Sequence, residues 1–316
     1  MTTKPPLKIG TRGSPLALAQ AYETRGRLME AHGLPEEAFE ICVIKTTGDD
    51  RALIDADIAL KTIGNKGLFT KEIEEAMLAG RIDIAVHSTK DMPTEQPYGL
   101  VMETFLPRED VRDAFVTLDA LSLSELPKGS VVGTSSLRRR AQLLNKRPDL
   151  KLVEFRGNVQ TRLKKLQDGV AAGTFLAMAG LNRLEMDDVP KKPVPEDEML
   201  PAVAQGTIGI ECRADDSAAR ELLAAIHHGP TGLRLAAERA FLYTLDGSCE
   251  TPIAGLAELD GDSLRLRGEI LRPDGSERLA DEISGPASDG ASLGKTLAET
   301  LLGRADADFF AWREPA

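Results

Sequence analysis

Strand-like runs alternate with segments of helical periodicity along the first two-thirds of the 316-residue chain, and this alternation limits the possible folds most. Residues 7–10 form a predicted strand, and Ser14 caps a predicted helix that ends at Gly33. Two more predicted strands follow at residues 39–44 and 82–86, with a helical segment between them. Strands and helices that alternate in this way favour an open α/β sheet whose strands are mostly parallel.

The middle of the chain repeats this alternation. Predicted strands occupy residues 130–133, 152–155 and 175–179. Ser136 caps a predicted helix that begins near Leu137, and a second helix is predicted over residues 159–167. Residues 185–198 are polar, contain prolines and are predicted to form a loop. Two successive α/β units predict two lobes with a cleft between them.

The last part of the chain has a different pattern. A predicted helix over residues 233–244 is followed by strand-like runs with turn signals at 260–262 and 273–275, and then by a helix over 293–302. This pattern predicts a small α+β domain with an antiparallel sheet. We therefore expect one α/β lobe from residues 1–106 and 207–226, a second lobe from 107–206, and a C-terminal domain from 227–316.

A basic segment lies within an acidic chain. The formal net charge is −11, yet residues 138–165 contain ten basic and two acidic residues, a local excess of +8. Such a segment indicates either a local site for a polyanion or a solvated helix face. The net charge and an aromatic content of 4% argue against nucleic acid as the ligand. A nucleotide phosphate has little support, because no phosphate-binding glycine motif follows a predicted strand.

Cationic side chains also follow the predicted strands, at the edge where an open α/β sheet binds its ligands. They come from both predicted lobes and are Arg12, Lys90, Arg138, Arg139, Arg156 and Arg183. A solvated face would instead place its charges along the flanks of helices. Guanidinium groups bind carboxylates in two-point geometry. The sequence therefore predicts an anion site, and a small molecule with many carboxylates suits it best.

The three cysteines cannot form a fully paired disulfide framework, and neither they nor the four histidines have metal-ligand spacing. Cys42 and Cys212 lie in apolar runs and are predicted core residues, whereas Cys249 lies in a polar glycine loop and is the candidate nucleophile or attachment site. No apolar run approaches the ~18 residues of a membrane span, and the N-terminus has no apolar signal region. We expect a reduced, cytoplasmic protein with no metal and no membrane partner.

Several motifs occur in order along nearly the whole chain. They lie at residues 9–20, 66–72, 87–93, 112–115, 133–139, 156–159, 205–206 and 247–249. Among them are His-Ser-Thr-Lys-Asp-Met-Pro, which ends at Pro93, and Gly-Ser-Cys, which ends at Cys249. Together these motifs resemble those of the porphobilinogen deaminase (hydroxymethylbilane synthase) family.

The resemblance implies a transferase of tetrapyrrole (haem) biosynthesis with three domains. Two of them would resemble the α/β lobes of periplasmic binding proteins around a cleft, and the third would carry the cofactor cysteine. The implied reaction condenses four porphobilinogen molecules head to tail with loss of ammonia, and water then releases hydroxymethylbilane. The implied primer is a dipyrromethane cofactor held by a thioether bond. Cys249 matches its attachment residue, and Asp91 matches the catalytic carboxylate.

Further family positions are matched by residues of this chain. The implied cofactor contacts are Ser88, Lys90, Thr134, Ser135, Ser136, Arg138, Arg139, Arg162 and Arg183. The implied substrate contacts are Arg12, Lys66, Arg156 and Gln205. Ala204 stands where the family usually has glycine, so we expect a stiffer hinge at that point. The polycarboxylate product of such a reaction would explain the basic segment without nucleic acid.

Two alternatives stay open at this level. A non-catalytic polyanion sensor of the periplasmic-binding-protein type would keep the arginines but would have no use for Asp91 and Cys249 together. A nucleic-acid-binding protein is the more distant alternative. For the function that the resemblance implies, we expect porphobilinogen as the small-molecule partner, no nucleic acid, and a monomer.

Overall fold

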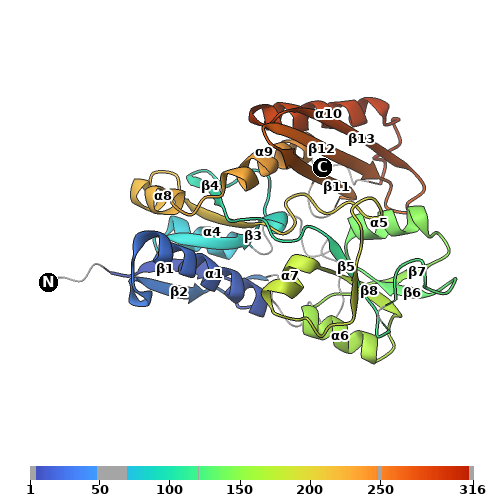
Figure 1. The fold of residues 1–316 in the computed structure, drawn as a ribbon, viewed down its shortest axis with the longest axis horizontal. Coiled ribbons are helices and arrows are strands. Elements are labelled where there is room, and N and C mark those ends of the chain that lie inside the picture. The colour runs from blue at the N-terminus through green and yellow to red at the C-terminus, as the bar shows by residue number, and fades with distance from the viewer. Residues whose placement is uncertain (1–4, 48–69, 120, 246, 248–250, 313–316) are drawn as a thin grey trace.

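The computed structural model describes residues 5–47, 70–119, 121–245, 247 and 251–312. Two five-stranded sheets and one three-stranded sheet form the centres of three parts of the fold, shown in Figure 1. The predicted fold class, two α/β lobes with a small C-terminal α+β domain, is confirmed. No helix in the described ranges is long and apolar enough to cross a membrane.

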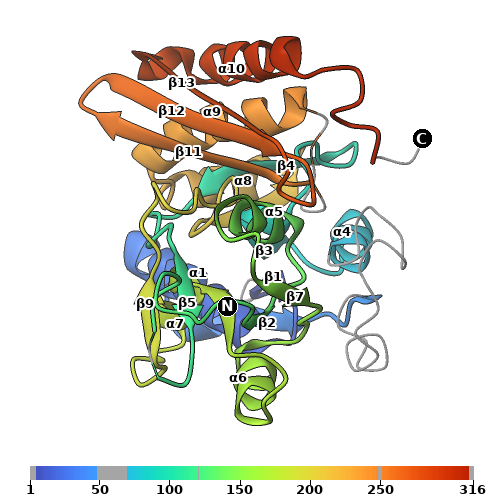
Figure 2. The same ribbon diagram turned by 90° about the vertical axis from the view of Figure 1, so that its right-hand side faces the viewer.

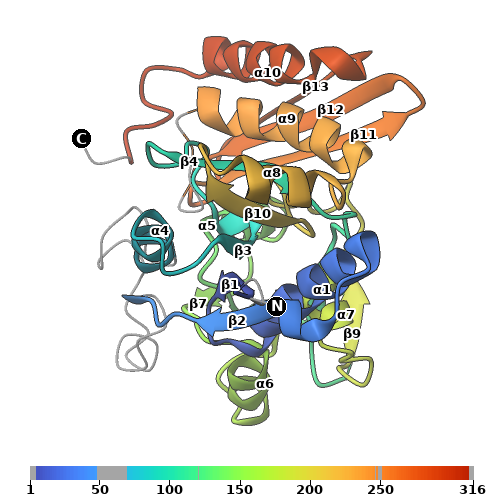
Figure 3. The same cartoon turned by 90° about the vertical axis from the view of Figure 1, so that its left-hand side faces the viewer.

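The first sheet has the strand order β2-β1-β3-β10-β4. Its strands are β1 (Leu7–Thr11), β2 (Phe39–Val43), β3 (Ile84–Ser88), β4 (Leu100–Phe105) and β10 (Ile208–Arg213). Apolar residues of α1 (Pro15–His32) and α8 (Ser217–Ala224) pack on one face of the sheet, and those of α4 (Lys71–Leu78) pack on the other. Figure 3 shows α1, α4 and α8 around this sheet.

The second sheet repeats this arrangement with the order β7-β6-β8-β5-β9. Its strands are β5 (Asp113–Val116), β6 (Val131–Gly133), β7 (Lys151–Val153), β8 (Gly173–Ala177) and β9 (Lys191–Pro193). Its helices are α5 (Leu137–Lys146), α6 (Val159–Gln167) and α7 (Met178–Arg183). The short helix α7 contacts α1 of the first lobe, which brings the two lobes together at this side.

One strand of each lobe runs against the others. The strand β10 is antiparallel to β3 and β4, and β5 is antiparallel to β8 and β9. The expectation of mostly parallel strands is confirmed, since the other four strands of each sheet run in one direction. Both antiparallel strands enter their sheet directly from the other lobe, over residues 106–112 and 194–207, so no crossover helix returns the chain to a parallel direction. The boundaries of the two lobes in the sequence stay a prediction.

Local sequence signals placed several helix ends correctly. The hydroxyl of Ser14 accepts a hydrogen bond from the backbone N–H of Ala17 at 3.3 Å and caps α1. At the other end Gly33 has φ 61°, a left-handed conformation that glycine adopts at little cost. The helix predicted over residues 159–167 is α6, with the same bounds.

Two local predictions were wrong. The predicted loop 185–198 contains the strand β9. This strand lies at the edge of the sheet, where Pro193 is tolerated although a proline has no backbone N–H to donate. The strand predicted over residues 175–179 ends at Ala177, because Met178 and Ala179 already belong to α7. In both places the run of polar or apolar residues was too short to distinguish a strand from a loop or from the start of a helix.

The C-terminal domain is an antiparallel meander with two helices on one face, as Figure 2 shows. Its elements are α9 (Gly229–Thr244), β11 (Ile253–Asp260), β12 (Ser263–Leu271), β13 (Arg278–Pro286) and α10 (Gly290–Arg304). Phe241 of α9 and Leu297 of α10 belong to the core on this face. The two helices cross closely at Gly294, where a Cβ would collide with the backbone carbonyl of Ala237.

A buried ion pair joins the three parts of the fold. Arg108 lies in the crossing from β4 to β5, and its guanidinium contacts both carboxylate oxygens of Glu238 on α9 at 2.6 and 3.1 Å. The same carboxylate accepts the backbone N–H of Ala204, in the second crossing, at 2.7 Å and that of Ala257, in β11, at 2.8 Å. Arg108 also donates to the carbonyl of Gln205 at 2.8 Å. One carboxylate thus connects both crossings to the C-terminal sheet.

The conformation of Ala204 bears on the hinge expectation. Its φ is 62°, in the left-handed region that glycine occupies more readily than alanine. The hydrogen bond from its N–H to Glu238 holds this backbone in place. The hydrogen bond to Glu238 therefore restrains the backbone at the position where the sequence predicts a stiffer hinge.

We expect Glu238→Gln to lower the free energy of unfolding by about 3–5 kcal/mol, because it leaves the Arg108 cation buried without a counter-charge. Glu282→Gln is the matched control. It removes one partner of the exposed Arg265–Glu282 pair and should cost less than ~1 kcal/mol. Urea denaturation of both variants measures the difference. Equal, small losses would show that the Arg108–Glu238 pair does not hold the three parts together.

Candidate functional site

A small pocket lies beyond the carboxyl ends of β1 and β3 in the first lobe. It has a volume of about 80 Å³, and its lining includes Arg12, Gln20, Ser88 and Asp91. Asp91 ends a short 3-10 turn after β3, and its side chain is exposed. The hydroxyl of Ser88 accepts a hydrogen bond from the Gln20 amide at 2.8 Å. Arg12, Ser88 and Asp91, predicted for the site from two separate segments, are therefore brought together here.

The predicted arginine pair lies in the first turn of α5 in the second lobe. Arg138 and Arg139 are buried, and both contact the fully buried carboxylate of Asp113 at the start of β5. The Arg138 guanidinium lies 2.8 Å from Oδ2, and Arg139 donates to Oδ1 at 2.7 and 3.2 Å. Arg139 also lies over the ring of Phe175, 5.9 Å from its centroid. The solvated-face reading of these two arginines is therefore wrong.

A chain of contacts links the two lobes at this site. The Lys90 ammonium donates to the side-chain oxygen of Gln205 at 3.2 Å, and the Gln205 amide donates to Asp113 Oδ1 at 2.9 Å. Gln205 is fully buried in the second crossing. The segment that carries Asp91 is thus connected through Gln205 to the carboxylate that holds Arg138 and Arg139.

Burial controls the charge of Lys90. It lowers the pKa of the Lys90 amine from the ordinary 10.5 to about 8, against the opposing effect of the carboxylates of Asp91 and Asp113. The nearby cations Arg139 and Arg138 lower it further. Lys90 is therefore an ammonium group below about pH 8 and becomes a neutral amine above it.

The three predicted hydroxyl residues shape the turn before α5. The Thr134 hydroxyl accepts the backbone N–H of Ser136 at 3.2 Å, and the Ser135 hydroxyl accepts that of Phe155 at 3.0 Å. Ser136 caps α5 by accepting the N–H of Arg139 at 3.4 Å. The turn chemistry of this motif therefore fixes the start of the helix that presents the arginine pair.

The remaining predicted arginines surround the same edge of the second lobe. Arg162 donates to the carbonyls of Gly157 and Phe175 at 2.9 and 3.2 Å. Arg183, in α7, contacts Glu23 of α1 at 3.2 Å. The Glu23 contact joins the two lobes directly, and Arg183 also donates to the carbonyl of Gly206 in the second crossing. Arg156 is buried beside this edge, at 6% exposure.

Two predicted site residues, Lys66 and Cys249, lie outside the described residues. Of the two other cysteines, Cys212 is part of the buried core of the first lobe, and Cys42 packs partly buried against a neighbouring cluster. Burial raises the pKa of the Cys212 thiol to about 11, so this thiol is a poor nucleophile at neutral pH.

Sequence reasoning missed Asp113 as a site residue. It was part of the Arg-Asp-Ala-Phe motif at residues 112–115, but only as a family signature. A carboxylate at the first position of an otherwise apolar strand was the signal that could have found it, because a fully buried acid needs charged partners.

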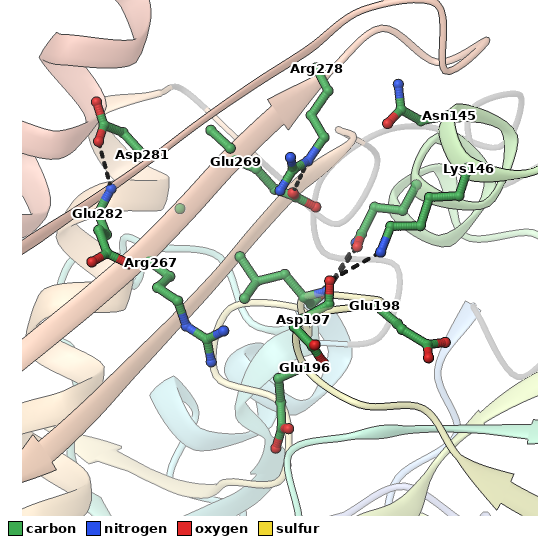
Figure 4. A pocket seen from close by; sticks show the side chains of 14 residues that line it. Asn145, Lys146, Glu196, Asp197, Glu198, Arg267, Glu269, Arg278, Asp281 and Glu282 are labelled. Atoms are coloured by element: carbon green, nitrogen blue, oxygen red, sulfur yellow. Dashed lines mark hydrogen bonds and ion pairs between the residues drawn. The ribbon is translucent and has the colours of Figure 1, made fainter.

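A larger pocket of about 340 Å³ lies between α5 and the sheet of the C-terminal domain, as Figure 4 shows. Its charged lining contains three basic residues, Lys146, Arg267 and Arg278, and six acidic ones, Glu196, Asp197, Glu198, Glu269, Asp281 and Glu282. This acidic excess would repel a molecule with many carboxylates. The predicted site residues of the described ranges do not line it. We propose the site instead at the first pocket and at the arginine edge of the second lobe, which comprises Arg138, Arg139, Arg156, Arg162 and Arg183.

The donor set at this site suits a polycarboxylate. Arg138, Arg139, Arg162 and Lys90 offer guanidinium and ammonium N–H groups, and each guanidinium carries five such donors. The dipyrromethane predicted from the sequence bears acetate and propionate groups, so these residues fit it chemically. The fold is that of a two-lobed α/β protein, and the cations gathered at the facing ends of the lobes are chemically suited to a small, highly carboxylated molecule.

Comparison with known proteins gives the family. A model described as porphobilinogen deaminase, dipyromethane cofactor binding domain, matches residues 7–221, and one for the porphobilinogen deaminase C-terminal domain matches residues 233–303. The porphobilinogen deaminase of Paracoccus denitrificans is 70% identical over 307 residues, which cover 97% of each chain. A chloroplastic porphobilinogen deaminase of Oryza sativa is 53% identical over 96% of this chain and 85% of its own length. The chain belongs to the porphobilinogen deaminase family.

Likeness to other solved structures is weaker. A periplasmic binding protein of Salmonella typhimurium with high arginine specificity aligns at a TM-score of 0.41 and 15% identity, over 71% of this chain and 92% of that one. A likeness at this level carries no conclusion about the site.

We expect kcat/KM for porphobilinogen to fall as the pH rises through about 8, because the half-buried Lys90 then loses the charge that pairs with carboxylates. Lys90→Arg keeps a cation at all these pH values and should move the alkaline fall to higher pH. Lys128→Arg, at an exposed position, is the control and should leave the profile unchanged. An alkaline midpoint that is the same in Lys90→Arg and in the unaltered protein would contradict this assignment.

Proposed function

We propose that the site at the junction of the two lobes carries out the reaction of the family to which the chain belongs. The chain is a transferase of tetrapyrrole biosynthesis, a hydroxymethylbilane synthase. It condenses four porphobilinogen molecules head to tail with loss of ammonia, and hydrolysis then releases hydroxymethylbilane. The non-catalytic sensor considered from the sequence is not favoured. The relative from Paracoccus denitrificans, which is 70% identical over 97% of both chains, is a porphobilinogen deaminase.

The residues of the arginine edge would hold the dipyrromethane cofactor. When bound, this group supplies the electron-rich pyrrole carbon to which the next unit is joined. Arg138, Arg139, Arg162 and Arg183 would pair with its carboxylates, together with Lys90. The hydroxyls of Ser88, Thr134, Ser135 and Ser136 would complete the contacts, and Cys249 would supply the thioether sulfur.

Asp91 would act on the reacting substrate. Loss of ammonia from porphobilinogen leaves a positive charge shared with the pyrrole ring, and an ionised carboxylate nearby stabilises that charge. Asp91 is exposed on the pocket that Arg12 also lines, so a pyrrole N–H can reach it while a substrate carboxylate meets a cation. Arg12, Arg156, Gln205 and Lys66 would orient the incoming porphobilinogen.

The observation that carries this proposal is the chain of contacts from Lys90 through Gln205 to Asp113 and Arg139. It supports a single site, because it connects the segment of Asp91 in one lobe to the arginine pair in the other. Porphobilinogen as the substrate, a cytoplasmic location and a monomeric state are part of the same proposal.

Cys249→Ser should abolish the covalent cofactor, since a hydroxyl does not replace the thiolate in forming the thioether. Intact-mass spectrometry of the purified variant should give the mass of the bare polypeptide, with almost no turnover of porphobilinogen. Cys42→Ser and Cys212→Ser are the matched controls and should keep the adduct. A full adduct on the Cys249 variant would refute the attachment site.

Asp91→Asn keeps the shape of the side chain and removes its charge. We expect it to slow single-turnover addition of porphobilinogen to cofactor-loaded enzyme by ~10²-fold or more, as when one preorganised charge-stabilising group is lost. Substrate binding should change much less, because the arginines bind the carboxylates. Asp91→Glu keeps the charge and should retain more activity than Asn. If Asn equals the unaltered enzyme, or exceeds Glu, Asp91 does not stabilise the developing charge.

A further inference from the structure

We propose that Asp113 is a positioning residue, an internal carboxylate that fixes the two guanidinium groups of Arg138 and Arg139 in the orientation in which their other N–H groups receive ligand carboxylates. The inference deepens the proposed function, on which it rests.

The Asp113 carboxylate contacts side chains from two other segments of the chain. Its side chain is fully buried, with Oδ1 bonded to Arg139 and to the Gln205 amide, and Oδ2 at 2.8 Å from Arg138. The two arginines come from one turn of α5, Asp113 from β5 and Gln205 from the interlobe crossing. One carboxylate therefore sets the relative position of three segments at the site.

Each arginine is held at a second point as well. Arg138 donates to the carbonyl of Leu200 at 2.8 Å, and Arg139 donates to that of Phe175 at 3.1 Å. With one end on a carbonyl and another on Asp113, each guanidinium plane is fixed. Each still has N–H groups beyond these contacts, because a guanidinium carries five. Asp113 thus orients both donors without using them up.

The charge of Asp113 also offsets repulsion within the site. Arg138, Arg139 and Lys90 bring three cations together, and like charges at such separations repel. Burial alone would raise the pKa of the Asp113 carboxyl, but the guanidiniums of Arg138 and Arg139 hold it well below its ordinary range, so the group stays ionised. Removing this charge leaves two adjacent buried guanidiniums without their shared partner.

The same carboxylate acts on Lys90 at a distance. The charged groups that face Lys90 are Asp91 on its own turn, Asp113 on β5, and Arg138 and Arg139 on α5. Of these, the two carboxylates favour the ammonium form and the two arginines oppose it. Neutralising Asp113 should therefore make Lys90 lose its proton at a lower pH, an effect that a merely structural residue would not produce.

The test compares Asp113→Asn, Asp113→Glu and Asp149→Asn as purified, cofactor-loaded proteins. Asp149 is the matched control, because it makes a two-point contact with Arg147 in the same lobe but outside the site. For Asp113→Asn we expect kcat/KM to fall by about tenfold or more, the size of one lost charge-assisted hydrogen bond. We also expect the alkaline midpoint of its pH profile to move to lower pH. Asp149→Asn should change neither quantity.

Asp113→Glu keeps the charge and displaces it by one methylene. We expect its alkaline midpoint to match that of the unaltered protein, while its kcat/KM falls about fivefold or more as the arginines that hold the cofactor are re-aimed. This variant decides the matter if Asp113→Asn does not fold. A wild-type kcat/KM in Asp113→Glu, or activity in Asp113→Asn with an unmoved alkaline midpoint, would overturn the inference. If the unaltered protein does not turn over porphobilinogen, that result would instead refute the proposed function itself.

Discussion

The buried ion pair between Arg108 and Glu238 is the contact on which the arrangement of the three parts depends. Burying two charges costs several kcal/mol per ion, and only good geometry with further hydrogen bonds offsets that cost. Here the Glu238 carboxylate also accepts the backbone N–H groups of Ala204 and Ala257. Both crossings between the lobes are thus tied to the C-terminal sheet at one point. The site forms directly beside this point, because Gln205 follows Ala204 in the chain.

At the site itself, the main physical difficulty is to gather cations before a polyanion arrives. The protein solves it with Asp113, which partners Arg138 and Arg139. Gln205 extends the same network to Lys90, whose burial leaves it close to losing its charge near pH 8. The arrangement favours a ligand with several carboxylates. The single carboxylate of Asp113 does not neutralise Arg138, Arg139 and Lys90 together, and the carboxylates of such a ligand would supply the remaining negative charge.

Local signals allowed much of this to be predicted from the sequence. The cap at Ser14, the stop at Gly33 and the bounds of α6 follow from contacts within a few residues. The directions of β5 and β10 could not be predicted, because they depend on which lobe the chain enters after each crossing. For the site, strand ends predicted the arginine pair, whereas Asp113 was missed because its partners lie 25 and more residues away in the sequence.

The proposed reaction assembles a tetrapyrrole on a covalently bound primer. Intact-mass spectrometry of the unaltered protein, before and after brief mixing with limiting porphobilinogen, tests it most directly. We expect a polypeptide that already carries a dipyrromethane before mixing, and afterwards a series of species whose masses differ by one porphobilinogen unit less ammonia. A bare polypeptide mass that porphobilinogen leaves unchanged would contradict it.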